Sequence, residues 1–167
     1  MQVYIGVVST NIFETLNPFW AAVDKKWIEP SVCRLFYVPE NSKELRKTSR
    51  WLQEISGRYL QPGNLLVDQH PFDDENIPGF VSAVKEIIKA EKEAGNKVVL
   101  DVTSAEWNYI PASLMLLAKE NRKVVKTVLY HQFSTPVYRE TPYPLVPLTE
   151  QRLYNLLNVD ALEDLSL

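Results

Sequence analysis

The chain has 167 residues, of which 46% are hydrophobic, 11% aromatic and 23% charged. This length fits one domain that can bury a core without disulfides or a structural metal, and the composition excludes an intrinsically disordered protein. The formal net charge of −3 argues against a broad basic face for duplex nucleic acid, although a small local anion site remains compatible with it.

Five short runs rich in β-branched and aromatic residues predict the strands of one sheet. They lie at residues 2–9, 32–38, 63–68, 97–102 and 124–130. Each run is too short for a helix that buries all its faces. Most are continuously apolar rather than alternating, which is typical of parallel strands that are covered on both faces.

Three helical patterns lie between these runs. Apolar residues recur at three- and four-residue steps over residues 45–59 and 80–94, and a shorter pattern covers residues 112–121. Gly95 follows the second pattern as an expected helix stop. Strands that alternate with helices predict βαβ crossovers, so we expect an α/β fold: a Rossmann-like, mainly parallel sheet with helices on both faces.

The texture of the sequence changes after the fifth run. Four prolines fall within residues 136–147, which breaks regular structure and is typical of an exit segment or strap. Residues 148–157 then predict an amphipathic helix with Thr149 as its N-cap. We therefore expect a Rossmann-like domain over residues 1–133. Residues 134–167 would form a proline-rich exit segment and a C-terminal helix that begins, or leads to, an effector domain.

Several common site chemistries are missing from the sequence. The single cysteine, Cys33, lies in an apolar run, so we expect it to pack in the core of a protein from a reducing, cytoplasmic compartment. It makes no zinc-site spacing with His70 and His131. The acidic residues 73–75 are better explained as favourable charges before a helix than as a metal site. Neither a glycine-rich phosphate loop nor a nucleophile elbow occurs, so we expect no metal and no cofactor, and likewise no signal peptide or membrane span.

The ends of the predicted strands are the places where a site is expected, because ligands bind open parallel sheets outside the carboxyl ends of the strands. The first strand leads into Ser9-Thr10-Asn11, and the fourth leads into residues 101–108. Hydroxyls and backbone N–H groups at such exits can surround a phosphate. The same residue types also form ordinary turns and helix caps, so the pattern alone leaves both interpretations open.

The fourth run and its exit, KVVLDVTS at residues 97–104, precede a small-residue helix. This stretch resembles the second signature of CARF domains, the CRISPR-associated Rossmann-fold sensors of cyclic oligoadenylates. The first exit looks like that family's first ligand-contacting loop, and residues 68–73 are similar to its lead-in to the next helix. The likeness covers roughly residues 2–133.

The family's fourth exit typically reads D-x-T-G-G-x-K-x-M, and this sequence departs from it. Asp101 and Thr103 match, Ser104 and Ala105 stand where two glycines are usual, Glu106 follows, and Trp107 replaces the lysine. In relatives that cut their own ligand, that lysine and a serine at the first exit are associated with activity. Ser9 is therefore the candidate catalytic residue, but the cation that offsets phosphate charge is missing.

The resemblance implies a homodimer that binds a cyclic oligoadenylate, with cyclic tetra-adenylate as our expectation, across its two-fold axis. The protein would be the sensor of a type III CRISPR antiviral response and would pass the signal to a C-terminal or separate effector. The expected ligand-binding residues are Ser9, Thr10, Asn11, Asp101, Thr103, Ser104, Ala105, Glu106, Trp107 and Asn108. Trp107 is expected either to stack on adenine or to pack against a neighbouring helix or subunit.

Three alternatives stay open. The resemblance also fits a stand-alone, metal-independent ring nuclease that cleaves the ligand to linear products and switches the response off, so whether the protein is an enzyme is undecided. A DNA-linked regulator would require residues 148–165 to begin a winged helix-turn-helix, against which the acidic tail argues. A Rossmann-like protein for an unrelated nucleotide is the remaining hypothesis.

Overall fold

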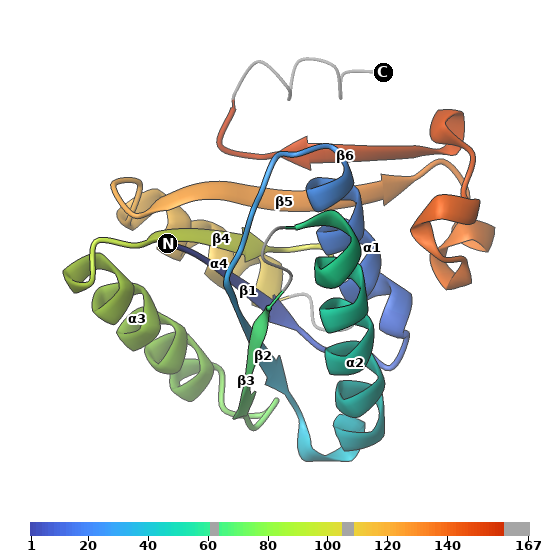
Figure 1. Cartoon of the computed structure of the whole chain (residues 1–167). Coiled ribbons are helices and arrows are strands. Elements are labelled where there is room, and N and C mark those ends of the chain that lie inside the picture. Colours follow the sequence, from blue (N-terminus) through green and yellow to red (C-terminus); the bar gives the residue numbers. More distant parts are fainter. Residues whose placement is uncertain (61–63, 105–108, 159–167) are drawn as a thin grey trace.

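The computed structural model describes residues 1–60, 64–104 and 109–158, and six of its strands form one sheet (Figure 1). The strands are β1 (Gln2–Val7), β2 (Val32–Tyr37), β3 (Leu66–Pro71), β4 (Lys97–Asp101), β5 (Val125–Phe133) and β6 (Gln151–Asn155). Their order in the sheet is β3-β2-β1-β4-β5-β6. Strands β1 to β5 are parallel, and β6 runs antiparallel to β5.

Helices cover both faces of this sheet, as Figure 1 shows. They are α1 (Ile12–Asp24), α2 (Ser42–Tyr59), α3 (Ile77–Glu93) and α4 (Tyr109–Glu120). Apolar residues of α1 and α2 share one buried cluster with the sheet, and apolar residues of α3 and α4 share the other. The predicted fold class, a Rossmann-like α/β sheet with helices on both faces, is confirmed.

Strand β1 lies in the middle of the sheet and contributes side chains to both buried clusters. Val3, Ile5 and Val7 belong to the cluster under α3 and α4, whereas Tyr4 and Val8, the residue just after the strand, belong to the cluster under α1 and α2. All five are at most 2% exposed. Side chains alternate between faces along a strand, so an apolar run without polar interruptions is what a doubly covered central strand requires.

Helix α1 was not among the predicted elements. Asn17 and Pro18 interrupt its pattern at mid-length, and proline lacks the N–H that a helix interior uses. The helix begins at a cap that the sequence does contain, because the Asn11 side chain accepts a hydrogen bond from the backbone N–H of Phe13 at 3.1 Å. Burial of residues such as Leu16 and Phe19, both fully buried, holds the helix against the sheet.

The prediction of a helix at residues 148–157, with Thr149 as its N-cap, is wrong. Leu148–Glu150 forms a 3₁₀ turn, and the chain then continues as β6. Gln151 lies opposite Phe133 in β5, and the pairing runs on to Asn155. Pairing with the otherwise open edge of β5 satisfies backbone groups along both strands, which outweighs a local helical pattern.

The third strand begins and ends later than predicted. It covers Leu66–Pro71, and residues 61–63 lie outside the described residues. Consequently Asp68, Gln69 and His70, at the end of the predicted run and in the predicted lead-in to the next helix, lie inside β3 and pair with β2.

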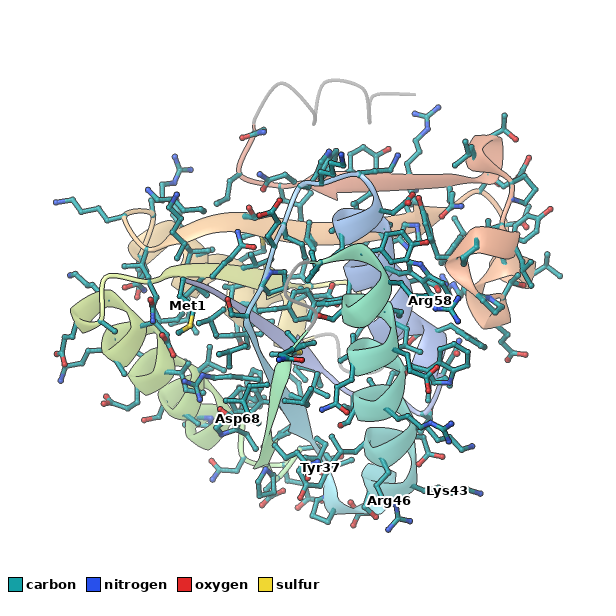
Figure 2. The ribbon with its side chains drawn as sticks, viewed as in Figure 1. Met1, Tyr37, Lys43, Arg46, Arg58 and Asp68 are labelled. Atoms are coloured by element: carbon teal, nitrogen blue, oxygen red, sulfur yellow. The ribbon has the colours of Figure 1, made fainter. Side chains whose placement is uncertain are left out.

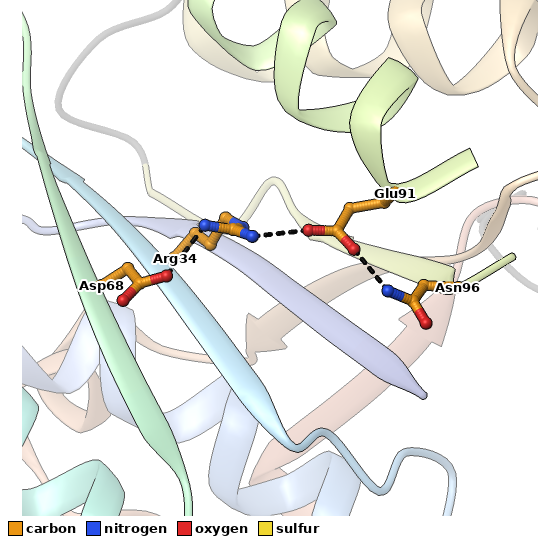
Figure 3. Close-up of polar contacts among 4 residues, drawn as sticks. All are labelled: Arg34, Asp68, Glu91 and Asn96. Carbon is orange, nitrogen blue, oxygen red and sulfur yellow. Dashed lines mark hydrogen bonds and ion pairs between the residues drawn. The ribbon is translucent and has the colours of Figure 1, made fainter. Parts of the chain in front are cut away.

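Arg34 of β2 links β3 to the end of α3 through two ion pairs (Figure 3). Its guanidinium lies 2.8 Å from the carboxylate of Asp68 and 2.6 Å from that of Glu91, to which the Asn96 side chain also donates at 2.6 Å. Burial pushes the pKa of Glu91 up, but the hydrogen bonds from Asn96 and Arg34 outweigh it and leave that pKa lowered. The network fixes α3 on the sheet.

The segment between β5 and β6, residues 134–150, is called the strap here. It contains 3₁₀ turns at Pro136–Glu140 and Tyr143–Leu145 and packs beside α1 (Figure 1). The Asn17 side chain donates to the carbonyl of Thr141 at 2.9 Å and accepts from the N–H of Tyr143 at 2.8 Å. Gln151 donates to the carbonyls of Tyr143 and Val146. The strap is thus fastened to the sheet and to α1 at several points.

Two further observations concern the core and the membrane. Cys33 is fully buried in the cluster under α1 and α2, which confirms the expectation that it packs in the core. Within the described parts of the chain, no helix combines the length and apolar character needed to cross a bilayer.

Candidate functional site

Strand order reverses between β1 and β4, since β2 and β3 lie on one side of β1 and β4 to β6 lie on the other. Beside this point is a pocket of about 780 Å³. Its walls come from the exit of β4, the first turns of α4, the end of β5, the strap and the first turn of α1. The site therefore lies at the place where open α/β sheets bind ligands.

At the first exit, the Ser9 hydroxyl is used in the hydrogen bonds of a turn. Ser9 is 1% exposed; its hydroxyl donates to the carboxylate of Glu14 at 2.9 Å and accepts from the N–H of Asn11 at 3.2 Å. Asn11 in turn caps α1, and Thr10 is exposed. Glu14 is the residue of this region that lines the pocket.

At the fourth exit, two of the predicted residues hold the chain in place. Asp101 is 4% exposed and accepts from the hydroxyl of Tyr4 at 2.8 Å and from the N–H of Thr103 at 2.9 Å. Burial raises the pKa of Asp101 to about 6. The Thr103 hydroxyl accepts from the N–H of His131 at 3.1 Å, so it links the β4 exit to β5.

Ser104 differs from these neighbours. It lines the pocket and is 5% exposed, and its hydroxyl has no hydrogen-bond partner among the described residues. A buried hydroxyl without a partner costs free energy, so a ligand group that bonds to it would be stabilised. The remaining predicted residues of this exit, Ala105, Glu106, Trp107 and Asn108, lie outside the described residues.

The structure adds His131, which the sequence did not single out as a site residue. It is 3% exposed at the end of β5, and its Nε2 lies 3.0 Å from the side-chain oxygen of Gln151. Because the Gln151 amide nitrogen donates to two carbonyls, its oxygen accepts, and Nε2 of His131 carries the proton. Its Nδ1 is then an acceptor and has no partner within residues 1–60, 64–104 and 109–158. Burial lowers the pKa of His131 to about 4, so the ring is neutral at pH 7.

Arg139 is the second addition. It lies in the strap, and its carbonyl accepts from the Asn11 side chain at 2.9 Å, which connects the strap to the first exit. Among the described residues that line the pocket, it is the single Lys or Arg. No sequence signal marked it, because it reaches the pocket only through the folding of the strap over α1.

These groups suit a ligand that carries both phosphates and hydrogen-bonding bases. Arg139 can pair with a phosphate, and Ser104 can donate to one, while Glu14 can accept from an exocyclic amine. In the described ranges, no three His, Cys, Asp or Glu side chains gather closely enough to hold a metal ion.

The sequence matches no protein-family model and no curated protein. Solved structures do resemble the fold, and among them is Enterococcus italicus Csm6 bound to cyclic hexa-2'-fluoro-hexa-dAMP. The superposition has a TM-score of 0.61 at 13% sequence identity. The two chains therefore share this α/β fold. The match covers 97% of this chain but only 43% of that chain, so the shared fold corresponds to less than half of the Csm6 length.

Proposed function

We propose that this CARF-like protein binds a cyclic oligoadenylate in the pocket beside β4 and β5, as the sensor of a type III CRISPR response. The observation that carries the proposal is the buried hydroxyl of Ser104, which has no hydrogen-bond partner among the described residues and lies in a pocket at the switch point of the sheet. The similar solved protein is bound to a cyclic hexanucleotide analogue, which supports this ligand class.

Arg139 supplies a cation at a site where the family's lysine is missing from the sequence. A guanidinium pairs well with a phosphate because it presents several donors in one plane. We propose that it takes over part of that lysine's role in binding. Two copies of the pocket, related by a two-fold axis, would meet the identical repeats of a cyclic ligand, so a homodimer is part of the proposal.

Binding is favoured over cleavage by the contacts of Ser9. Its hydroxyl is 1% exposed and is already engaged with Glu14 and Asn11, which is the geometry of a turn. Cleavage to linear products, the ring-nuclease alternative, is therefore a possible outcome of the test rather than the proposal.

Ser104→Ala tests the proposal with little effect on folding, because the hydroxyl it removes has no protein partner in the described structure. A hydrogen bond to a charged group contributes about 1.5–3 kcal/mol, so the Kd for cyclic tetra- or hexa-adenylate should rise about ten- to a hundredfold. Calorimetry gives the affinity, and the melting temperature should be unchanged or slightly higher. Ser82→Ala, at an exposed serine of α3, is the matched control.

Equal affinity of Ser104→Ala and the unmodified protein would contradict the proposed site. Chromatography of the incubated ligand separates the two activities, since linear products would identify a ring nuclease. Light scattering with and without ligand tests the homodimer. Thr103→Ala is less informative, because Thr103 also supports His131 and its loss should lower the melting temperature.

A further inference from the structure

The outer face of α2 carries an unusual density of positive charge for a protein whose net charge is −3. Five of the 18 basic residues lie in this one helix: Lys43, Arg46, Lys47, Arg50 and Arg58. All five are exposed. In Figure 2, Lys43 and Arg46 project from one end of α2 and Arg58 lies toward its other end.

The spacing of these residues places them along one stripe. Lys43, Lys47 and Arg50 follow at steps of four and three, and Arg58 lies eight residues further on, so they share one side of the helix. Arg46 borders the stripe. From Lys43 to Arg58 the stripe rises over 15 residue steps, or about 22 Å at 1.5 Å per residue.

Most of this charge is not neutralised by the protein. Arg50 pairs with Glu54 at 3.0 Å. Lys43, Arg46, Lys47 and Arg58 form no ion pair with the rest of the described chain. Basic residues in the first two turns also oppose the helix macrodipole, which favours acidic residues there. The charge is therefore not explained by the stability of α2.

An exposed aromatic ring lies directly beside the stripe. Trp51 lies four residues after Lys47 and seven before Arg58, so it borders the same side of the helix. It is 42% exposed, although large aromatic side chains are normally well buried. Trp20 of α1 lies next to it, with ring centroids 6.3 Å apart and planes tilted by 32°. Trp20 thus supports Trp51 from the side of α1 while part of the Trp51 ring stays open to solvent.

We infer that this outer face of α2 binds single-stranded nucleic acid, separately from the pocket beside β4 and β5. Cations along a stripe attract phosphates, and an exposed, supported indole stacks on an unpaired base; together they are the features of sequence-tolerant single-strand surfaces. The length of the stripe limits the contact to about six phosphates even at the 3.4 Å spacing of a stacked strand. A narrow stripe of this kind is compatible with the net charge of −3, which argues only against a broad basic face.

The test measures anisotropy of fluorescein-labelled oligouridylate and oligothymidylate of 12 nucleotides, which avoid adenine and hence the proposed pocket. Lys43→Ala/Arg46→Ala/Lys47→Ala removes three cations and should make the slope of log Kd against log salt shallower by about two. The matched control removes three exposed lysines of α3, Lys85→Ala/Lys89→Ala/Lys92→Ala. It should leave both the slope and the affinity unchanged.

Trp51→Ala should raise the Kd about five- to a hundredfold, and Trp51→Phe, which keeps a stacking ring, should recover most of the affinity. A circular dichroism melt verifies that each variant is folded. Equal losses in the α2 and α3 triple variants, or no effect of Trp51→Ala, would overturn the inference. So would equal affinity for a 12-base-pair duplex, or binding of anionic phosphatidylglycerol vesicles in place of the oligonucleotides.

Discussion

Two buried groups, Asp101 at the end of β4 and His131 in β5, should oppose one another in the pH dependence of stability. Burial raises the pKa of Asp101 from 3.8 to about 6 and lowers the pKa of His131 from 6.5 to about 4. In the intervening pH range the folded protein keeps a proton on Asp101 that the unfolded chain has released. The unfolded chain keeps a proton on His131 that the folded protein has released.

The two effects have opposite signs and similar size. Each pKa unit corresponds to about 1.4 kcal/mol. As the pH rises from about 4 to about 7, the free energy of unfolding should therefore fall by about 2–3 kcal/mol because of Asp101 and rise by about 3 kcal/mol because of His131. The two contributions largely cancel, so the pair contributes an almost flat profile.

Single variants should reveal each effect. Asp101→Asn removes the falling contribution, so its stability should rise with pH relative to the unmodified protein. His131→Gln keeps a donor toward Gln151 and removes the rising contribution, so its relative stability should fall with pH. Urea unfolding followed by tryptophan fluorescence at four pH values between about 4.5 and 7.5 measures both. Differences from the unmodified protein cancel the rising contributions expected from His70 and Glu91, whose pKa values are lowered. Parallel profiles for all three proteins would refute the reasoning.

Two further predictions concern the network on β2 and the strap. Arg34→Leu should lower the free energy of unfolding, measured by urea unfolding, by about 3–5 kcal/mol, because the Glu91 side chain, which is 5% exposed, loses its ion pair. The double variant Arg34→Leu/Glu91→Leu should recover most of the lost stability. Gln151→Ala should cost about 2–3 kcal/mol, because it leaves buried carbonyls of the strap without donors, and should speed hydrogen exchange in residues 134–150. A variant that loses stability without faster exchange in the strap would contradict the second prediction.

The sheet was predictable where the strands are apolar on both faces. The runs that became β1, β2 and β4 are continuous because helices cover both sides of them, and burial of this kind is written into local composition. Strand β6 was not predictable in this way. Its sequence repeats apolar residues at helical steps, and only the open edge of β5, a feature of the whole fold, makes it a strand.

Some residues of the candidate site could likewise be predicted from local sequence, and others could not. Position at a strand exit was enough to select Ser104, which lines the pocket and whose hydroxyl has no partner in the described part of the chain. Position did not distinguish it from Thr103 and Asp101, whose hydrogen bonds hold the exit in place. Arg139 reaches the pocket only after the strap has folded over α1, and His131 meets the exit through the pairing of β5 with β4, so no local pattern in the sequence could mark either residue.

The central position of β1 also has a consequence for the order in which the protein can fold during synthesis. One edge of β1 pairs with β2 about 30 residues later, but its other edge waits for β4, and the Tyr4 hydroxyl waits for Asp101. Until then that edge of β1 stays unpaired, and the face formed by Val3, Ile5 and Val7 lacks the β4 and α4 residues of its cluster. Of the strands described, the first to be synthesised is thus among the last to be completed, and a ribosome that stalls before residue 97 would leave a partial sheet with an exposed apolar edge, which chaperones are suited to bind.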